Sequence, residues 1–74
     1  MISVNILLDT AEKIKRFTAA MSGFETDCEI VKDHSIIDAH SVMGIFSLSL
    51  DKPVKLNIYS DNTEITEKIK EFIV

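Results

Sequence analysis

Few side chains in this sequence have the types and spacing that chemistry requires. Cys28 is the lone cysteine, so the chain has neither a disulfide framework nor a cysteine cluster for zinc. His34 and His40 are the two histidines, and two histidines without a third ligand make a poor metal site. There is no paired-carboxylate site and no Ser/His/Asp arrangement for nucleophilic catalysis. The sequence therefore predicts no enzyme, no metal site and no cofactor.

The same three side chains have simple structural interpretations. Cys28 lies on the inward face of an alternating stretch, which favours a buried and inert thiol over a reactive one. His40 could sense pH or steady a phosphate, but a solvated surface residue is the preferred interpretation. His34 is expected to start a strand beside Asp33.

Ser41 begins the stretch around which the chain is organised. It is a good N-cap for a short helix, because Val42 and the residues after it are apolar. At about 100° per residue, Ile45 and Leu48 fall on one side of this helix. A short helix that is apolar on two sides cannot bury both against one small core, so we expect one side to face inward and the other to contact a partner. The partner-facing side, called the docking patch below, consists of Val42, Met43 and Phe46.

Hydrophobic periodicity predicts the elements that position these residues. Alternating apolar residues indicate half-buried strands at 2–8, 24–30, 34–38 and 54–59. A helix is expected from Ala11 to Met21, a short one after Ser41, and a last one opened by the cap-type residues 60–64. The order is β-α-β-β-α-β-α, which predicts an α+β fold: a four-stranded, mostly antiparallel sheet with three helices on one face. We expect residues 1–74 to form a single domain.

Four local details follow from the same patterns. Asp9 and Glu12 have the spacing of a capping box at the start of the first helix. Lys32-Asp33 is expected to form a tight turn, although it lacks the glycine that hairpin turns prefer. The inward face of the first helix is expected to contain Ala11, Ile14, Phe17, Thr18 and Met21. The inward stripe of the last helix is expected to contain Ile65, Ile69, Phe72 and Ile73.

Composition excludes several classes of function. The chain carries 8 Lys and Arg against 12 Asp and Glu, for a net charge of −4, which argues against nucleic-acid binding. No basic run offers a contact for an anionic membrane, and no apolar run approaches transmembrane length. No signal peptide is visible, and a lone cysteine fits a reducing compartment. We therefore expect a cytoplasmic protein.

The central run is similar to that of a known family. Ala39-His40-Ser41-Val42-Met43-Gly44-Ile45-Phe46-Ser47-Leu48 resembles the regulatory-serine segment of HPr, the histidine-containing phosphocarrier protein of the sugar phosphotransferase system. Ser22-Gly23-Phe24 stands where the family has Ser-x-Phe at the end of its first helix. The resemblance covers nearly the whole chain and implies the HPr-like open-faced β-sandwich as its fold. The last helix is shorter than in typical members.

The chain departs from the family at the phosphoacceptor. The family histidine opens the first helix in a Gly-x-His-x-Arg-Pro pattern. Counting back without gaps from Ser41 and Phe24, the histidine falls on Thr10 and the arginine on Glu12. A phosphocarrier needs an imidazole nucleophile and positive charge around the phosphoryl group. The sequence therefore predicts no phosphohistidine transfer, with Thr10 as a helix cap, and resembles the catabolite-repression paralogue of HPr.

The resemblance implies a regulatory or adaptor protein, in which an HPr kinase phosphorylates Ser41 and the docking patch contacts protein partners. These partners would be the kinase and a transcriptional regulator, and the chain would be a monomer or a weak homodimer. Two alternatives stay open. One is a binding or self-association module that keeps the fold but has no phosphotransferase role. The other is a divergent phosphocarrier that uses another acceptor residue.

Overall fold

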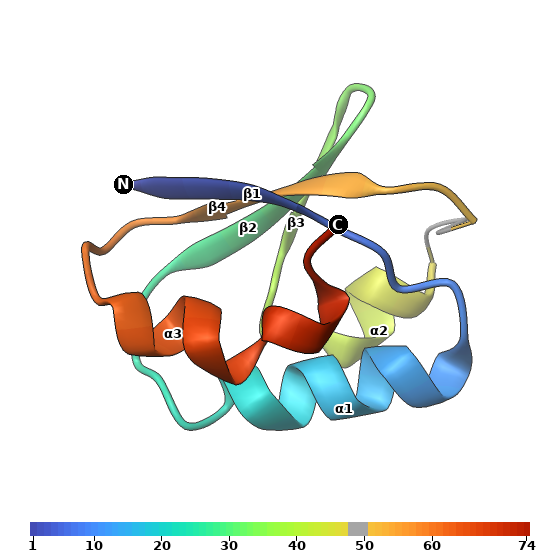
Figure 1. The fold of residues 1–74 in the computed structure, drawn as a ribbon. Coiled ribbons are helices and arrows are strands. Elements are labelled where there is room, and N and C mark those ends of the chain that lie inside the picture. Colours follow the sequence, from blue (N-terminus) through green and yellow to red (C-terminus); the bar gives the residue numbers. More distant parts are fainter. Residues whose placement is uncertain (48–50) are drawn as a thin grey trace.

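The sheet contains four strands in the order β1-β4-β2-β3, and every neighbouring pair is antiparallel (Figure 1). The computed structural model describes residues 1–47 and 51–74. The strands are β1 (Ile2–Ile6), β2 (Cys28–Lys32), β3 (Ser35–Asp38) and β4 (Val54–Ile58). Leu48, expected to face the core from the short helix, lies outside the described residues.

Three helices lie on one face of this sheet and leave the other face open (Figure 1). They are α1 (Ala11–Met21), α2 (Val42–Phe46) and α3 (Thr63–Lys68), and a 3-10 helix, η1 (Lys70–Phe72), continues from α3. The α+β class and the β-α-β-β-α-β-α order expected from the sequence are thereby confirmed.

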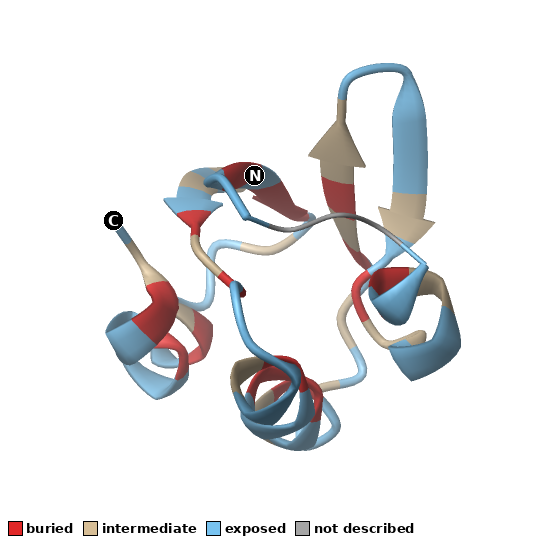
Figure 2. Cartoon of the chain, turned by 90° about the vertical axis from the view of Figure 1, so that its right-hand side faces the viewer, coloured by how far each residue is buried: buried red, intermediate tan, exposed pale blue. Residues whose placement is uncertain are grey.

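The core lies between the helices and the inner face of the sheet (Figure 2). Phe17 of α1 and Phe72 of η1 meet edge to face, with ring centroids 5.7 Å apart, and both side chains are buried. This contact joins the first helix to the end of the chain. The inner positions of the strands that complete the core include Ile6, Ile30, Leu56 and Ile58.

Several boundaries and positions differ from the sequence prediction. β2 begins at Cys28 rather than at residue 24, because pairing with β4 starts only where Tyr59 N–H donates to the carbonyl of Asp27. The tight turn is Asp33-His34, where Asp33 has φ 54°, a left-handed conformation that aspartate tolerates. His34 therefore lies in the turn and does not start β3. Ala11 is exposed because it opens the first turn of α1, at the end of the helix.

The end of β1 also differs from the prediction. β1 stops at Ile6 rather than at Leu8, because Leu7 turns its N–H to the carbonyl of Phe72, at 2.9 Å. Leu8 is nevertheless fully buried. The C-terminal residues thus lie beside the outer edge of β1, as Figure 1 shows.

A chain of hydrogen bonds crosses the open face of the sheet. Ser3 Oγ donates to Asn57 Oδ1 at 2.8 Å, and Asn57 Nδ2 donates to Glu29 Oε1 at 3.3 Å. Tyr59 donates its hydroxyl proton to the same Glu29 oxygen at 2.5 Å, and this hydrogen bond raises the pKa of Tyr59. Four polar side chains of the open face therefore hydrogen-bond to one another across β1, β4 and β2.

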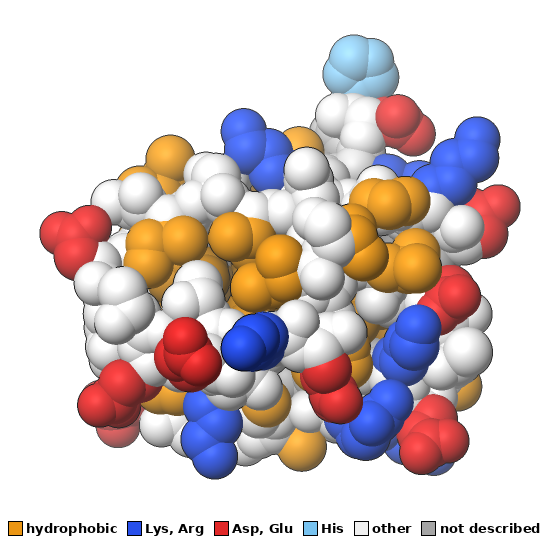
Figure 3. Space-filling model, viewed as in Figure 1, with side chains coloured by type: hydrophobic (Ala, Val, Ile, Leu, Met, Phe, Trp, Pro, Cys, Tyr) orange, Lys and Arg blue, Asp and Glu red, His pale blue; other side chains and the backbone are white. Residues whose placement is uncertain are grey.

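Charged side chains of both signs are interspersed along the helical side of the face shown in Figure 3. That face has no continuous basic surface of the kind that nucleic-acid binding requires. Among the described residues, no helix is long and apolar enough to cross a membrane.

Candidate functional site

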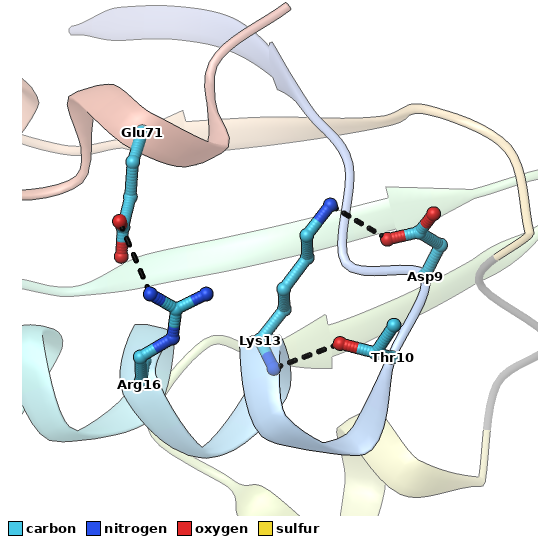
Figure 4. Close-up of polar contacts among 5 residues, drawn as sticks. All are labelled: Asp9, Thr10, Lys13, Arg16 and Glu71. Atoms are coloured by element: carbon cyan, nitrogen blue, oxygen red, sulfur yellow. Dashed lines mark hydrogen bonds and ion pairs between the residues drawn. The ribbon is translucent and has the colours of Figure 1, made fainter.

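At the start of α1, the side chains of Asp9, Thr10 and Lys13 are engaged in contacts with neighbouring residues of the same segment (Figure 4). This arrangement is called the closed start of α1 below. Thr10 is the N-cap, and its Oγ1 accepts a hydrogen bond from the N–H of Lys13 at 3.1 Å. The capping box expected for Asp9 and Glu12 is therefore wrong, whereas the prediction that Thr10 caps the helix is confirmed. The Asp9 carboxylate instead pairs with Lys13 Nζ at 2.8 Å, and this hydrogen bond lowers the pKa of the Asp9 carboxyl.

The next cation along α1 is turned toward the C-terminal segment. Arg16 Nη1 lies 3.3 Å from Glu71 Oε2, and the guanidinium carbon lies 5.9 Å from the centre of the Phe72 ring (Figure 4). These contacts fasten α1 to η1. Lys13 and Arg16 thus both have carboxylate partners, which compete with any anion for these two charges.

Replacing Thr10 by alanine removes an N-cap hydrogen bond, and we expect a loss of about 0.5–2 kcal/mol in the free energy of unfolding. Thr10→Asn is the matched control, because asparagine is an equally good cap and should restore most of the loss. Thermal unfolding of the three proteins measures both effects. Equal midpoints for Thr10→Ala and the parent would show that Thr10 does not act as a cap.

Ser41 caps α2 in the way the sequence predicts. Its Oγ accepts a hydrogen bond from the N–H of Gly44 at 3.2 Å, and the side chain is half-buried. Gly44 allows this arrangement, because a Cβ at that position would lie 2.8 Å from Ile37 Cγ2 and 3.0 Å from Ser41 Oγ. The glycine therefore lets α2 approach β3 closely while Ser41 holds the first turn.

The two sides of α2 are separated as the periodicity indicates. Ile45 is fully buried, whereas Val42, Met43 and Phe46 are 39%, 83% and 42% exposed. The docking patch is therefore available at the surface and does not complete the core. Its role in docking stays a prediction.

The remaining reactive side chains are held by local contacts. Cys28 is buried, and the burial raises the pKa of its thiol to about 11, so at neutral pH it is protonated and a weak nucleophile. His40 is half-buried rather than solvated, with Nε2 3.0 Å from the carbonyl oxygen of Thr26. A carbonyl only accepts, so Nε2 carries the proton in this contact. His34 is exposed in the β2–β3 turn.

The structure places the docking patch near the end of the molecule where α1 begins, since α2 packs beside α1 (Figure 1). It brings no histidine to the start of α1, because His34 and His40 lie in the hairpin turn and before α2. No group of three or more metal-ligating side chains occurs among the residues that the structure describes.

Two contributors to this site were missed by sequence reasoning. In the sequence, Gly44 stands out only as part of the run that resembles the family, because its close approach to Ile37 depends on tertiary packing. Asp38 holds the turn that leads to Ser41: its Oδ1 accepts from His40 N–H at 2.9 Å, and its carbonyl accepts from Ser41 N–H at 3.0 Å. An aspartate two residues before a turn residue could have indicated the first of these bonds.

Comparison with known proteins finds similarity in solved structures. The phosphocarrier protein HPr from Bacillus anthracis is 25% identical, with a TM-score of 0.76, and the match covers 99% of this chain and 94% of that one. The HPr-C-His protein from Thermoanaerobacter tengcongensis is 26% identical, with a TM-score of 0.75 over 95% of this chain and 85% of that one. The histidine-containing phosphocarrier protein of a Mycoplasma has a TM-score of 0.73 at 14% identity, over 95% of this chain and 86% of that one.

No family model and no curated protein sequence matches the chain. This chain therefore shares its fold and about a quarter of its residues with these HPr structures from Thermoanaerobacter tengcongensis and Bacillus anthracis. The element order and the near-complete coverage match the HPr fold.

Proposed function

We propose that this HPr-like protein is a regulatory or adaptor protein and does not carry a phosphoryl group on histidine. The observation that carries the proposal is the closed start of α1. Thr10 stands at the N-cap, where the ungapped count places the family phosphoacceptor, and its hydroxyl is engaged by Lys13 N–H. A hydroxyl at this position lacks the imidazole nitrogen that phosphoenolpyruvate-dependent transfer uses.

The local charges support the same proposal. Asp9 precedes the cap, and Glu12 lies in the first turn of α1. Negative charge there suits the helix dipole but repels an incoming phosphoryl group. The cation that lies closest in sequence, Lys13, is paired with Asp9.

Ser41 is the proposed regulatory phosphorylation site, acted on by an HPr kinase with ATP. Its hydroxyl lies at the first turn of α2, next to the exposed docking patch. A phosphate at this position would meet backbone N–H donors and would add about two negative charges beside an apolar surface. Phosphorylation would thereby change what the patch binds, which is the basis of the proposed adaptor role toward a transcriptional regulator.

The experiment is incubation of the purified protein with ATP and an HPr kinase, followed by mass measurement. We expect one phosphate on Ser41 and none on Ser41→Asn, which keeps a capping oxygen but has no hydroxyl. Circular dichroism on Ser41→Asn checks that the helix content is unchanged. If a standard HPr is modified under the same conditions and this protein is not, the regulatory proposal fails.

A further inference from the structure

The two edges of the sheet differ in whether another segment of the described chain pairs with them. At the β1 edge, Leu7 N–H donates to the carbonyl of Phe72 at 2.9 Å, and Val74 N–H donates to the carbonyl of Asn5 at 3.0 Å. The C-terminal residues therefore cover part of this edge. At the β3 edge, no backbone group of a described residue hydrogen-bonds to Ile36 on the side of the strand that faces away from β2. An uncovered edge is a template for pairing with another strand.

The pairing of β3 with β2 determines which backbone N–H and C=O groups of β3 point away from the sheet. Ala39 N–H donates to the carbonyl of Cys28 at 3.0 Å, and the register of β2 and β3, continued by one residue beyond Glu29 and Asp38, places these two residues opposite each other. Hydrogen-bonded and non-hydrogen-bonded pairs alternate in an antiparallel ladder, so Ile37 also faces β2. The N–H and C=O of Ile36 and the N–H of Asp38 therefore point away from the sheet.

On the helical side of the sheet, α2 packs against β3. Gly44 of α2 lies so close to β3 that a Cβ there would come within 2.8 Å of Ile37 Cγ2. The Ile36 side chain, on the opposite face of the same strand, is 63% exposed. Figure 2 shows the hairpin projecting, with its outer strand largely exposed. The strand is thus held in an extended conformation with one large apolar side chain uncovered.

We propose that β3 pairs antiparallel with β3 of a second copy of this chain, with Ile36 opposite Ile36 of the second copy. In this register, the outward N–H and C=O of each Ile36 bond to each other in both directions, as a two-fold contact requires. On the open face, Val31 is the cross-strand neighbour of Ile36. Val31 and Ile36 from the two copies then form one continuous apolar row.

The charges select this register over its neighbours. With Ile36 opposite itself, continuing the register past the end of β3 brings the turn residue His34 beside Asp38 of the second copy, where an imidazole N–H can donate to a carboxylate at both ends of the contact. A shift of two residues toward Asp38, which is the smallest shift that still uses the outward groups, places Ile36 opposite Asp38. A further shift places Asp38 opposite Asp38, which is repulsive. Of these three registers, the one with Ile36 opposite Ile36 makes the edge complementary to itself.

The contact is weak because it is small. β3 has four residues, and each copy carries a net charge of −4. Interfaces well below about 1,200 Å² are transient, and like net charges oppose association more at low salt. Dimers are therefore expected at high protein concentration and should increase with ionic strength.

Sedimentation equilibrium from about 10 µM to about 1 mM protein tests the proposal, together with amide exchange measured at both ends of that range. We expect the average mass to rise toward the dimer and the Ile36 amide to exchange more slowly at high concentration. Ile36→Pro removes the outward N–H at a position where an edge tolerates proline, and it should stay monomeric. Ile36→Val is the matched control and should still dimerise.

A second pair of variants does not depend on how Ile36→Pro folds. His34→Asp places like charges opposite Asp38 and should weaken the dimer by about 2- to 5-fold per symmetric contact, while His34→Lys should keep it. A monomer at all concentrations would overturn the proposal. A dimer that survives Ile36→Pro but is lost in Met43→Asp/Phe46→Asp would also overturn it, because self-association would then use the docking patch.

Discussion

Replacing Met43 and Phe46 together by aspartate is expected to leave the protein folded and to weaken strongly the proposed binding to protein partners. The fold is retained because both side chains are exposed and Ile45, on the other side of α2, keeps the contact with the core. Binding is lost because exposed Met and Phe side chains are typical anchors of an interface, and two buried carboxylates would remain unpaired there. Truncating an anchor commonly costs 2 kcal/mol or more, so the affinity should fall by about 100-fold or more.

The measurement is a titration of each variant with the HPr kinase or with a regulator that binds the parent protein. Thr63→Asp/Val74→Asp is the matched control, because both positions are exposed and lie outside α2, so it adds the same charge elsewhere. The control should bind as the parent does. If the thermal transition of Met43→Asp/Phe46→Asp collapses, the patch belongs to the core; if binding persists, the interface lies elsewhere.

Replacing Phe17 by alanine is expected to lower stability more than any other single change discussed for this chain. Phe17 is fully buried and meets Phe72 edge to face at 5.7 Å, so the change removes both its packing and the contact between α1 and η1. Burial of a phenylalanine and the cavity left behind are worth about 3–5 kcal/mol, which approaches the total stability of a small domain. The midpoint of thermal unfolding should fall by roughly 15–30 °C, or the chain should not fold.

Phe46→Ala is the matched control, because the same chemical change is made where the side chain is 42% exposed. Its thermal midpoint should move by only a few degrees. Similar losses for Phe17→Ala and Phe46→Ala would contradict the assignment of one to the core and the other to the surface.

Much of the fold could be predicted because the apolar residues keep regular periods. The stretch from Ala11 to Met21 has helical spacing between Ile14, Phe17 and Met21, and its observed limits agree with the prediction. The separation of α2 into a buried and an exposed side also follows from spacing alone. Both features depend on local sequence, which the hydrophobic pattern records directly.

The errors occur where tertiary contacts decide the conformation. Residues 24–27 alternate as a strand does, yet they have no strand partner before Asp27, so they form a loop. The capping box expected for Asp9 and Glu12 is a local error: Thr10, also expected to cap the helix, is the cap of α1, and the Asp9 carboxylate pairs with Lys13. His40 is held by the carbonyl of Thr26, which is far from it in sequence.

In the candidate site, too, some features follow from local sequence and others depend on tertiary contacts. The N-cap role of Ser41 and the exposure of Met43 could be predicted, since both depend on position along one short helix. The place of Gly44 against Ile37 could not, because it depends on how closely α2 approaches the sheet. The uncovered edge of β3 also depends on strand order, which alternation does not reveal.

The most direct measurement is incubation of the purified protein with phosphoenolpyruvate and the first enzyme of the phosphotransferase system, beside a standard HPr. The closed start of α1 predicts no acid-labile phosphate on this protein while the standard is labelled, because Thr10 offers a hydroxyl already engaged as a cap. Acid-labile phosphate on the protein would contradict the account. Loss of that label in His40→Gln or His34→Gln would then identify the acceptor.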